Sequence, residues 1–147
     1  MMHKPYMLDT NTCSFIMRGA PVSVLARLHK AVSGKRGLVI SAITYMELRR
    51  GACNPKASPK LHQTIDQFLQ RIHGILPFGR VAAEFSGRVY GQLAAQGQLI
   101  GNNDIGIAGH CLAADCILVT NNTREFARVE GLEIEDWVAG ESSPGAA

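Results

Sequence analysis

Residues 38–51 read LVISAITYMELRRG, and this stretch predicts a strand that leads directly into a helix. Its first three residues form a short apolar run. Ser41 can cap the helix that follows, because its hydroxyl can accept a hydrogen bond from the first helical N–H groups. Gly51 is a residue type that often ends helices, so we expect the helix to stop there. A buried strand followed at once by a helix is the repeating unit of a parallel α/β sheet.

The same alternation continues on both sides of this stretch. Short apolar runs predict further strands, at residues 6–8, 74–78, 116–119 and 132–137. Apolar residues at helical spacing predict further helices, at residues 22–33, 58–72, 82–97 and from 102 to about 112. The pattern therefore predicts an α/β fold with a mainly parallel sheet, as one domain over residues 1–138. A flexible tail of small and polar residues is expected at 139–147.

Length and composition exclude several classes of protein. A chain of 147 residues can form a single hydrophobic core. No apolar stretch approaches the roughly 20 residues that cross a bilayer, and the first residues do not resemble a signal peptide. We therefore expect a cytoplasmic protein with no membrane partner. The net charge of +3 permits a nucleic-acid partner without requiring one.

The cysteines point to packing rather than to chemistry. None of them forms a CxxC pair, and no histidine cluster accompanies them at zinc-ligand spacing. In a cytoplasmic chain we expect them to be small buried hydrophobic residues rather than disulfides or metal ligands. The four are Cys13, Cys53, Cys111 and Cys116.

Three acids and one asparagine occupy positions where parallel sheets bind ligands. Asp9 and Asn122 each follow a predicted strand. Asp104 begins a helix, and Glu47 lies in the second turn of another. Ligands of open parallel sheets bind beyond the carboxyl ends of the strands, so these side chains are expected to converge there. Carboxylates in one cleft repel each other unless a cation neutralises them, and hard oxygen ligands favour Mg²⁺ or Mn²⁺.

Each of these residues also has a structural interpretation. Asp9 could cap a turn, and Asn122 could form one. Asp104 could be a favourable acid in the first turn of a helix. Glu47 could be a solvated helix residue that pairs with a neighbouring arginine. Their joint placement favours a site, but it does not name the reaction.

Four stretches, taken in order, resemble the successive motifs of VapC-type PIN-domain toxins. They read MLDTN at residues 7–11, SAITYMELRRG at 41–51, IGNNDIGIAGH at 100–110 and LVTNNTREF at 118–126. The closing IEDW at 134–137 also resembles the end of that family, so the likeness extends from about residue 6 to residue 138. The resemblance implies a three-layer α/β/α fold and an endoribonuclease that depends on Mg²⁺, with Mn²⁺ as a substitute.

Matched motif by motif, the resemblance also implies roles for single residues. Asp9 and Asp104 match the principal metal ligands. Glu47 matches the third acid, which binds a metal directly or orients its water. Asn122 stands where many PIN domains have a fourth acid, and this departure leaves open how firmly a second metal is held. These four residues are the candidate catalytic residues.

Cations are expected around an acidic site that binds RNA, because the phosphates must be attracted to it. The candidates lie within or beside the motifs: Arg18, Arg49, Arg50 and Arg124. Arg49 or Arg50 could instead pair with Glu47 or a neighbouring carboxylate. Thr120 and Glu125 are expected near the cleft, as a ligand-orienting residue and an edge residue. His110 is expected to be a packing or surface residue rather than a general base.

The resemblance further implies the partners. They are a cognate VapB-type antitoxin that blocks the site, transfer RNA as the substrate, and a second copy of this chain in a homodimer. The helices between residues 58 and 95 are the candidate dimer interface, and a toxin–antitoxin hetero-oligomer is expected.

Three alternatives compete with a metal-dependent nuclease. A haloacid-dehalogenase-type phosphatase needs a second acid two residues after the first, but position 11 is Asn. A two-component receiver domain needs paired acids on its first strand and a lysine on a late one, and neither is present. The remaining alternative is a PIN-like protein that only binds RNA or protein; the presence of Asp9, Glu47 and Asp104 together argues against it.

Overall fold

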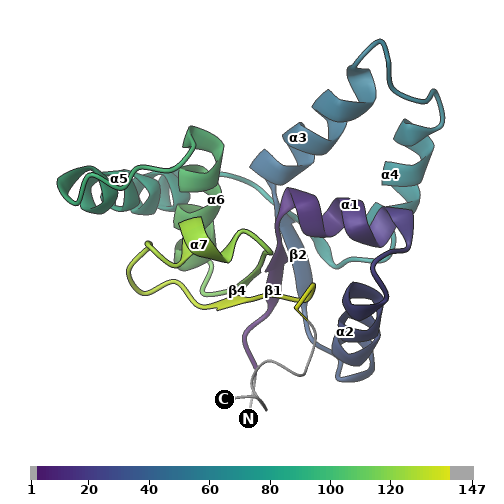
Figure 1. Ribbon diagram of the computed structural model, residues 1–147, viewed down its shortest axis with the longest axis horizontal. Coiled ribbons are helices and arrows are strands. Elements are labelled where there is room, and N and C mark those ends of the chain that lie inside the picture. The colour runs from purple at the N-terminus through teal and green to yellow at the C-terminus, as the bar shows by residue number, and fades with distance from the viewer. Residues whose placement is uncertain (1–2, 140–147) are drawn as a thin grey trace.

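The computed structural model describes residues 3–139, which form a sheet with helices on both faces (Figure 1). The strands are β1 (Tyr6–Leu8), β2 (Leu38–Ser41), β3 (Gly74–Leu76), β4 (Ile117–Val119) and β5 (Ile134–Glu135). The helices are α1 (Thr10–Arg18), α2 (Val22–Ser33), α3 (Ala42–Cys53), α4 (Leu61–Leu69), α5 (Arg80–Ala95), α6 (Asn102–Ala113) and α7 (Thr123–Phe126). The α/β class and the order of the predicted elements are confirmed.

The described strands form a five-stranded sheet in the order β3-β2-β1-β4-β5. Each pair of neighbouring strands is parallel. The chain builds β1, β2 and β3 in one direction and then crosses β1 to add β4 and β5 on its other side. The order of the strands thus reverses between β1 and β4, which is where ligands of open parallel sheets usually bind.

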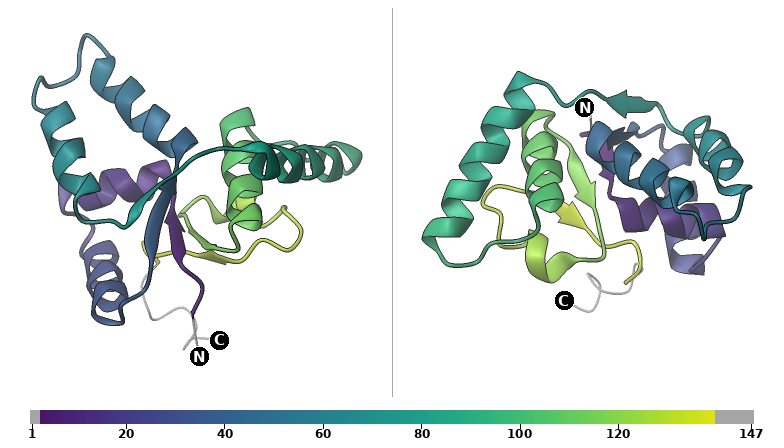
Figure 2. Two further views of the ribbon diagram at one scale, coloured as in Figure 1. Left: turned by 180° about the vertical axis from the view of Figure 1, so that it is seen from behind. Right: turned by 90° about the horizontal axis from the view of Figure 1, so that it is seen from above.

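Two hydrophobic cores lie on opposite faces of the sheet. The two further views show the helices on either side of the sheet that cover them (Figure 2). Along β1, side chains alternate between the faces, as strand geometry requires. Tyr6 and Leu8 pack with α1, α2, α3 and α4. Met7 packs on the other face with α5, α6 and α7. This arrangement confirms the three-layer α/β/α architecture.

The segment after β1 contains a helix that the sequence analysis did not predict. Asp9 is the N-cap of α1, and its Oδ1 accepts a hydrogen bond from Thr12 N at 2.8 Å. Gly19 ends the helix at a φ of 74°, a conformation that glycine adopts without strain. The opening Thr-Asn-Thr has low helix propensity and hides the helical period. The helix forms because Cys13 and Ile16 bury against the first core.

Several predicted ends are wrong by a few residues. Gly51 does not end α3, which continues to Cys53 because Ala52 packs into the first core. The last strand is shorter than predicted, since only Ile134 and Glu135 pair with β4. Between β4 and β5 lies the short helix α7, for which no element was predicted.

The cysteine prediction holds for Cys13, Cys111 and Cys116, which are buried, but not for Cys53, which is exposed at the end of α3. Of the predicted tail, residues 140–147 lie outside the described part of the chain. Between residues 3 and 139, no helix is both long and apolar enough to cross a membrane.

Candidate active site

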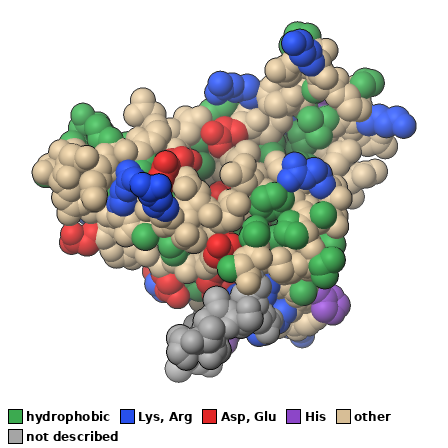
Figure 3. All heavy atoms as spheres, in the orientation of Figure 1, with side chains coloured by type: hydrophobic (Ala, Val, Ile, Leu, Met, Phe, Trp, Pro, Cys, Tyr) green, Lys and Arg blue, Asp and Glu red, His purple; other side chains and the backbone are tan. Residues whose placement is uncertain are grey.

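A cavity of about 430 Å³ opens where the carboxyl ends of β1, β2 and β4 meet. It brings together the four candidate catalytic residues and one candidate RNA-binding residue, Arg50. Figure 3 shows this face of the molecule, with acidic side chains near the middle and Lys and Arg side chains around them. The complete lining is Asp9, Thr10, Asn11, Glu47, Arg50, Gly51, Asn54, Asp104, Ile107, Asn122 and Phe126.

Asp9 caps a helix and also lines the cavity. It directly follows β1, and its backbone N donates to Val119 O at 3.1 Å, which ties it to the end of β4. Its side chain caps α1 and is only 6% exposed, yet it also lines the cavity. Burial raises the pKa of Asp9, hydrogen bonds from Thr120 and Thr12 oppose the shift, and the charge of Glu47 adds to it.

Glu47 is held by hydrogen bonds from two other helices. Its Oε1 accepts from Thr10 Oγ1 at the start of α1, and its Oε2 accepts from Asn103 Nδ2 of α6 at 3.0 Å. The alternative in which Arg49 pairs with Glu47 is wrong, because Arg49 pairs with Asp66 of α4. Glu47 therefore joins the starts of α1 and α6 to α3 at the wall of the cavity.

Asp104 is the residue whose ionisation the cavity disfavours most clearly. It lies in the first turn of α6 and is partly buried. Burial, followed by the negative charges of Glu47, Glu125 and Asp9, raises the pKa of Asp104 to about 6. A carboxyl group with such a pKa is withdrawn from water and lies near other negative charges, and perturbed groups of this kind are enriched at functional sites.

Asn122 lines the cavity, whereas its hydrogen-bond partners Thr120 and Glu125 are not among the lining residues. Asn122 N donates to Thr120 Oγ1 at 2.9 Å, and Asn122 Nδ2 donates to Glu125 Oε1 at 3.0 Å. Thr120 is fully buried, at 0% exposure, and Glu125 adds its charge to the field at Asp104. Asn122 can therefore form a turn after β4 and line the cavity at the same time.

The donor set has the chemistry of a hard-cation site, since it consists of carboxylate, amide and hydroxyl oxygens. Within residues 3–139, however, no three His, Cys, Asp or Glu side chains are grouped closely enough to hold a metal ion on their own. Both Glu47 oxygens already accept hydrogen bonds from the protein. The cavity therefore fits a cation that keeps several waters, as Mg²⁺ usually does, with one or two direct carboxylate ligands.

The other candidate RNA-binding arginines do not line the cavity. Arg49 lies between α3 and α4, where it donates to Asp66, to Tyr45 OH at 3.1 Å and to the His62 carbonyl at 3.4 Å. Arg18 stacks on Phe15 at 5.2 Å, at the far end of α1. Arg124 is exposed on α7. For all four arginines, RNA binding stays a prediction.

Two residues that position Glu47 were not among the candidates from the sequence, namely Thr10 and Asn103. Each directly precedes or follows one of the acids, within the motifs that drew attention. The position next to an acid was therefore the sequence signal for both residues. For Thr10 this signal could not be interpreted without the α1 helix, because α1 orients Thr10 toward α3.

Comparisons with known proteins identify the family of this chain. The PIN domain family matches residues 6–132, which include every acid that lines the cavity. The tRNA(fMet)-specific endonuclease VapC of Shigella flexneri is 42% identical over 132 residues, 90% of this chain and 97% of that protein. Ribonuclease VapC2 of Haemophilus influenzae is 39% identical over 133 residues, 90% of this chain and 98% of that protein. The crystal structure of DNA-bound VapBC from Salmonella typhimurium aligns with a TM-score of 0.82 and 37% identity, over 92% of this chain and 99% of that one.

Proposed function

This chain belongs to the PIN domain family, and from that premise we propose that it is a VapC-type endoribonuclease that depends on Mg²⁺. In this proposal it is the toxin of a type II toxin–antitoxin pair and hydrolyses phosphodiester bonds in transfer RNA, which inhibits translation. The observation that carries the proposal is the convergence of Asp9, Glu47 and Asp104 in one cavity, together with the raised pKa of Asp104.

The roles of the acids follow from their surroundings. Asp9 and Asp104 would bind the metal ion, as their match to the principal ligand positions of the family motifs implies, while both oxygens of Glu47 accept hydrogen bonds from Thr10 and Asn103. Glu47 and Asn122 would hold and orient water by hydrogen bonds, which fixes the geometry around the ion. Bound Mg²⁺, or Mn²⁺ in its place, supplies polarisation of a phosphate oxygen and a lowered pKa for water.

Arg50 has the position of a phosphate-binding residue. It is exposed on α3 and lines the cavity beside Glu47 and Asp104. RNA is repelled by the acids and attracted by a cation at the rim, so Arg50 would hold the strand while the acids hold the ion. The same reasoning gives Arg124, Arg18 and Arg49 a weaker claim, since they lie outside the cavity.

The partners are proposed from the relatives. The Salmonella typhimurium relative was crystallised as VapBC, and a cognate VapB-type antitoxin is the corresponding partner here. The Shigella flexneri relative is named for tRNA(fMet), which makes transfer RNA the first substrate to test. A homodimer, a toxin–antitoxin hetero-oligomer and a cytoplasmic location complete the proposal.

Cleavage of total RNA and of purified tRNA by the purified protein tests the function. We expect discrete products with Mg²⁺, none with EDTA, and recovery when Mg²⁺ is restored in excess. The Asp9→Asn and Asp104→Asn variants should be inactive. Asp115→Asn is the matched control, because Asp115 is exposed and pairs with Lys4 outside the cavity. RNA that stays intact with wild-type protein, or cleavage that survives EDTA, would contradict the proposal.

A further inference from the structure

His110 is a buried histidine that the proposed chemistry does not use. It lies on α6, the helix that carries Asp104, and is 4% exposed. Its ring packs edge-on against Phe78, with centroids 5.4 Å apart and an interplanar angle of 85°. It does not line the acidic cavity. As expected from the sequence, it is a packing residue, but one of its nitrogens has a specific partner.

That partner is Ser41, the residue that caps α3. His110 Nδ1 lies 2.8 Å from Ser41 Oγ, and Ser41 Oγ accepts a hydrogen bond from Ile43 N at 3.1 Å. We assign the hydroxyl hydrogen of Ser41 to this contact, with Nδ1 of His110 as the acceptor in the neutral tautomer that is protonated at Nε2. Burial lowers the pKa of His110, which keeps the imidazole neutral and able to accept.

One turn earlier, the same face of α6 meets the same turn of α3. A Cβ atom on Gly106 would lie 2.5 Å from Ile43 Cδ1, so the absence of a side chain allows the close approach. Gly106 and His110 are four residues apart and therefore lie on one face of the helix. The two helices thus make two adjacent contacts, a close packing contact at Gly106 and a hydrogen bond at His110.

We propose that His110 is a positioning residue for the acidic cavity. Its side chain fixes α6 against the capped start of α3, and this contact sets the placement of Asp104 relative to Glu47. The proposal rests on the proposed function, because that placement matters when a metal ion must be held. Asn103 Nδ2 bonds Glu47 at the cavity end of α6, and the His110–Ser41 bond holds the opposite end of the contact. His110 touches neither substrate nor ion.

A pair of substitutions separates this role from simple packing. His110→Phe keeps a ring against Phe78 and removes the acceptor at Nδ1. His110→Asn loses the ring but places an amide oxygen near the position of Nδ1, two bonds from Cβ. We expect His110→Phe to bind Mn²⁺ about 10-fold more weakly in the absence of RNA, by electron paramagnetic resonance, as typical for supporting groups around metal sites. His110→Asn should recover most of that affinity.

A double-mutant cycle with Ser41→Ala provides the second measurement, and it serves even where one variant loses stability. If the hydrogen bond carries the effect, His110→Phe should weaken Mn²⁺ binding in wild type and add little in the Ser41→Ala background. Circular dichroism melting identifies the folded fraction of each variant, to which affinities are normalised.

The outcomes are distinguishable. Equal Mn²⁺ affinity and equal RNA cleavage by wild type and His110→Phe would overturn the positioning role while the nuclease function stands. A His110→Asn variant no better than His110→Phe, or additive effects with Ser41→Ala, would also overturn it. Wild-type protein that neither binds Mn²⁺ nor cuts RNA would instead overturn the proposed function.

Discussion

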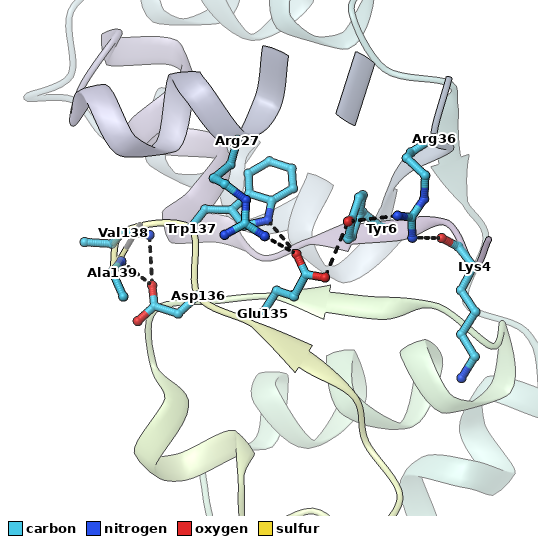
Figure 4. A network of polar contacts seen from close by, with 9 residues as sticks. All are labelled: Lys4, Tyr6, Arg27, Arg36, Glu135, Asp136, Trp137, Val138 and Ala139. Carbon is cyan, nitrogen blue, oxygen red and sulfur yellow. Dashed lines mark hydrogen bonds and ion pairs between the residues drawn. The ribbon is translucent and has the colours of Figure 1, made fainter. Parts of the chain in front are cut away.

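Two polar clusters in this molecule differ in how the negative charge of their carboxylates is compensated. The first surrounds Glu135 on β5, which accepts from Arg27 Nη2 at 2.7 Å, from Trp137 Nε1 at 3.1 Å and from Tyr6 OH at 3.4 Å (Figure 4). Arg36 extends this cluster by donating to Tyr6 OH and to the Lys4 carbonyl. A guanidinium therefore balances the charge of Glu135 directly.

The second cluster is the acidic cavity, where the hydrogen bonds to the carboxylates come from neutral groups. Thr12 N donates to Asp9, while the Thr10 hydroxyl and the Asn103 amide donate to Glu47. The pKa of Asp104 is raised to about 6 by burial and by the charges of the other acids. Glu135 is paired with a guanidinium, and this ion pair stabilises the fold. The carboxylates of the cavity have neutral hydrogen-bond donors, so their negative charge can be compensated by a cation bound from solution.

The largest difference between the clusters is expected in RNA cleavage. Asp104→Asn removes a proposed metal ligand, and we expect activity to fall at least about 100-fold. Glu135→Gln keeps the shape of its side chain and lies outside the cavity, so activity per folded molecule should change less than about 2-fold. Initial rates on tRNA with Mg²⁺ measure both. Comparable losses of activity in the two variants would show that the two clusters do not differ in their role in cleavage.

Stability should show the reverse order. Glu135→Ala leaves Arg27 partly buried without its carboxylate and removes the acceptor of Trp137. We expect a loss of about 2 kcal/mol in the free energy of unfolding, below that of a fully buried pair because both side chains are partly exposed. Asp104→Asn should not destabilise the metal-free protein. Urea unfolding in EDTA makes the comparison, and a larger loss for Asp104→Asn would refute it.

Two adjacent arginines give a smaller contrast within α3. Arg50 lines the cavity, whereas Arg49 is engaged by Asp66 of α4. Arg50→Gln should weaken RNA binding by roughly 5-fold at moderate salt and flatten its salt dependence, as expected for loss of one phosphate contact. Arg49→Gln should leave RNA binding nearly unchanged. Binding of a catalytically inactive Asp9→Asn background to tRNA, titrated with KCl, measures both effects.

The smallest effect is the pH dependence of stability without metal. Because the folded pKa of Asp104 is raised above its unfolded value, the folded state binds more protons between about pH 4 and pH 6. Stability should therefore be greatest below this range and fall as the pH rises through it. Melting temperatures in EDTA from pH 4 to 7 should show this fall in wild type and a reduced fall in Asp104→Asn. A wild-type curve that does not fall more steeply than that of the variant would contradict the sign.

The fold could be predicted from the sequence where the hydrophobic pattern is strong. The run Leu38–Ile40 followed by Ser41 is such a case, since the serine caps α3 as predicted. The α1 helix could not be predicted, because its first residues favour no helix and its stability comes from packing Cys13 and Ile16 against the sheet. The prediction that α3 ends at Gly51 was wrong for the same reason, because the tertiary contacts of Ala52 extend the helix past it.

The candidate site could be predicted as a set of residues but not as an arrangement. The positions of Asp9, Asp104 and Glu47 at element boundaries indicated that they converge. The contacts that position Glu47 come from residues on two other helices, Thr10 of α1 and Asn103 of α6. Those pairs depend on how α1, α3 and α6 pack, and no local pattern in the chain encodes that packing.

The most direct test of the unbalanced acidic cavity is the pKa of Asp104, measured by NMR titration of its side-chain carboxyl carbon with and without Mg²⁺. We expect a pKa near 6 in EDTA. In saturating Mg²⁺ it should fall below about 4, because a bound cation favours the ionised form. An ordinary pKa in EDTA, or a raised value that Mg²⁺ does not change, would contradict the claim that these carboxylates hold charge for a metal ion.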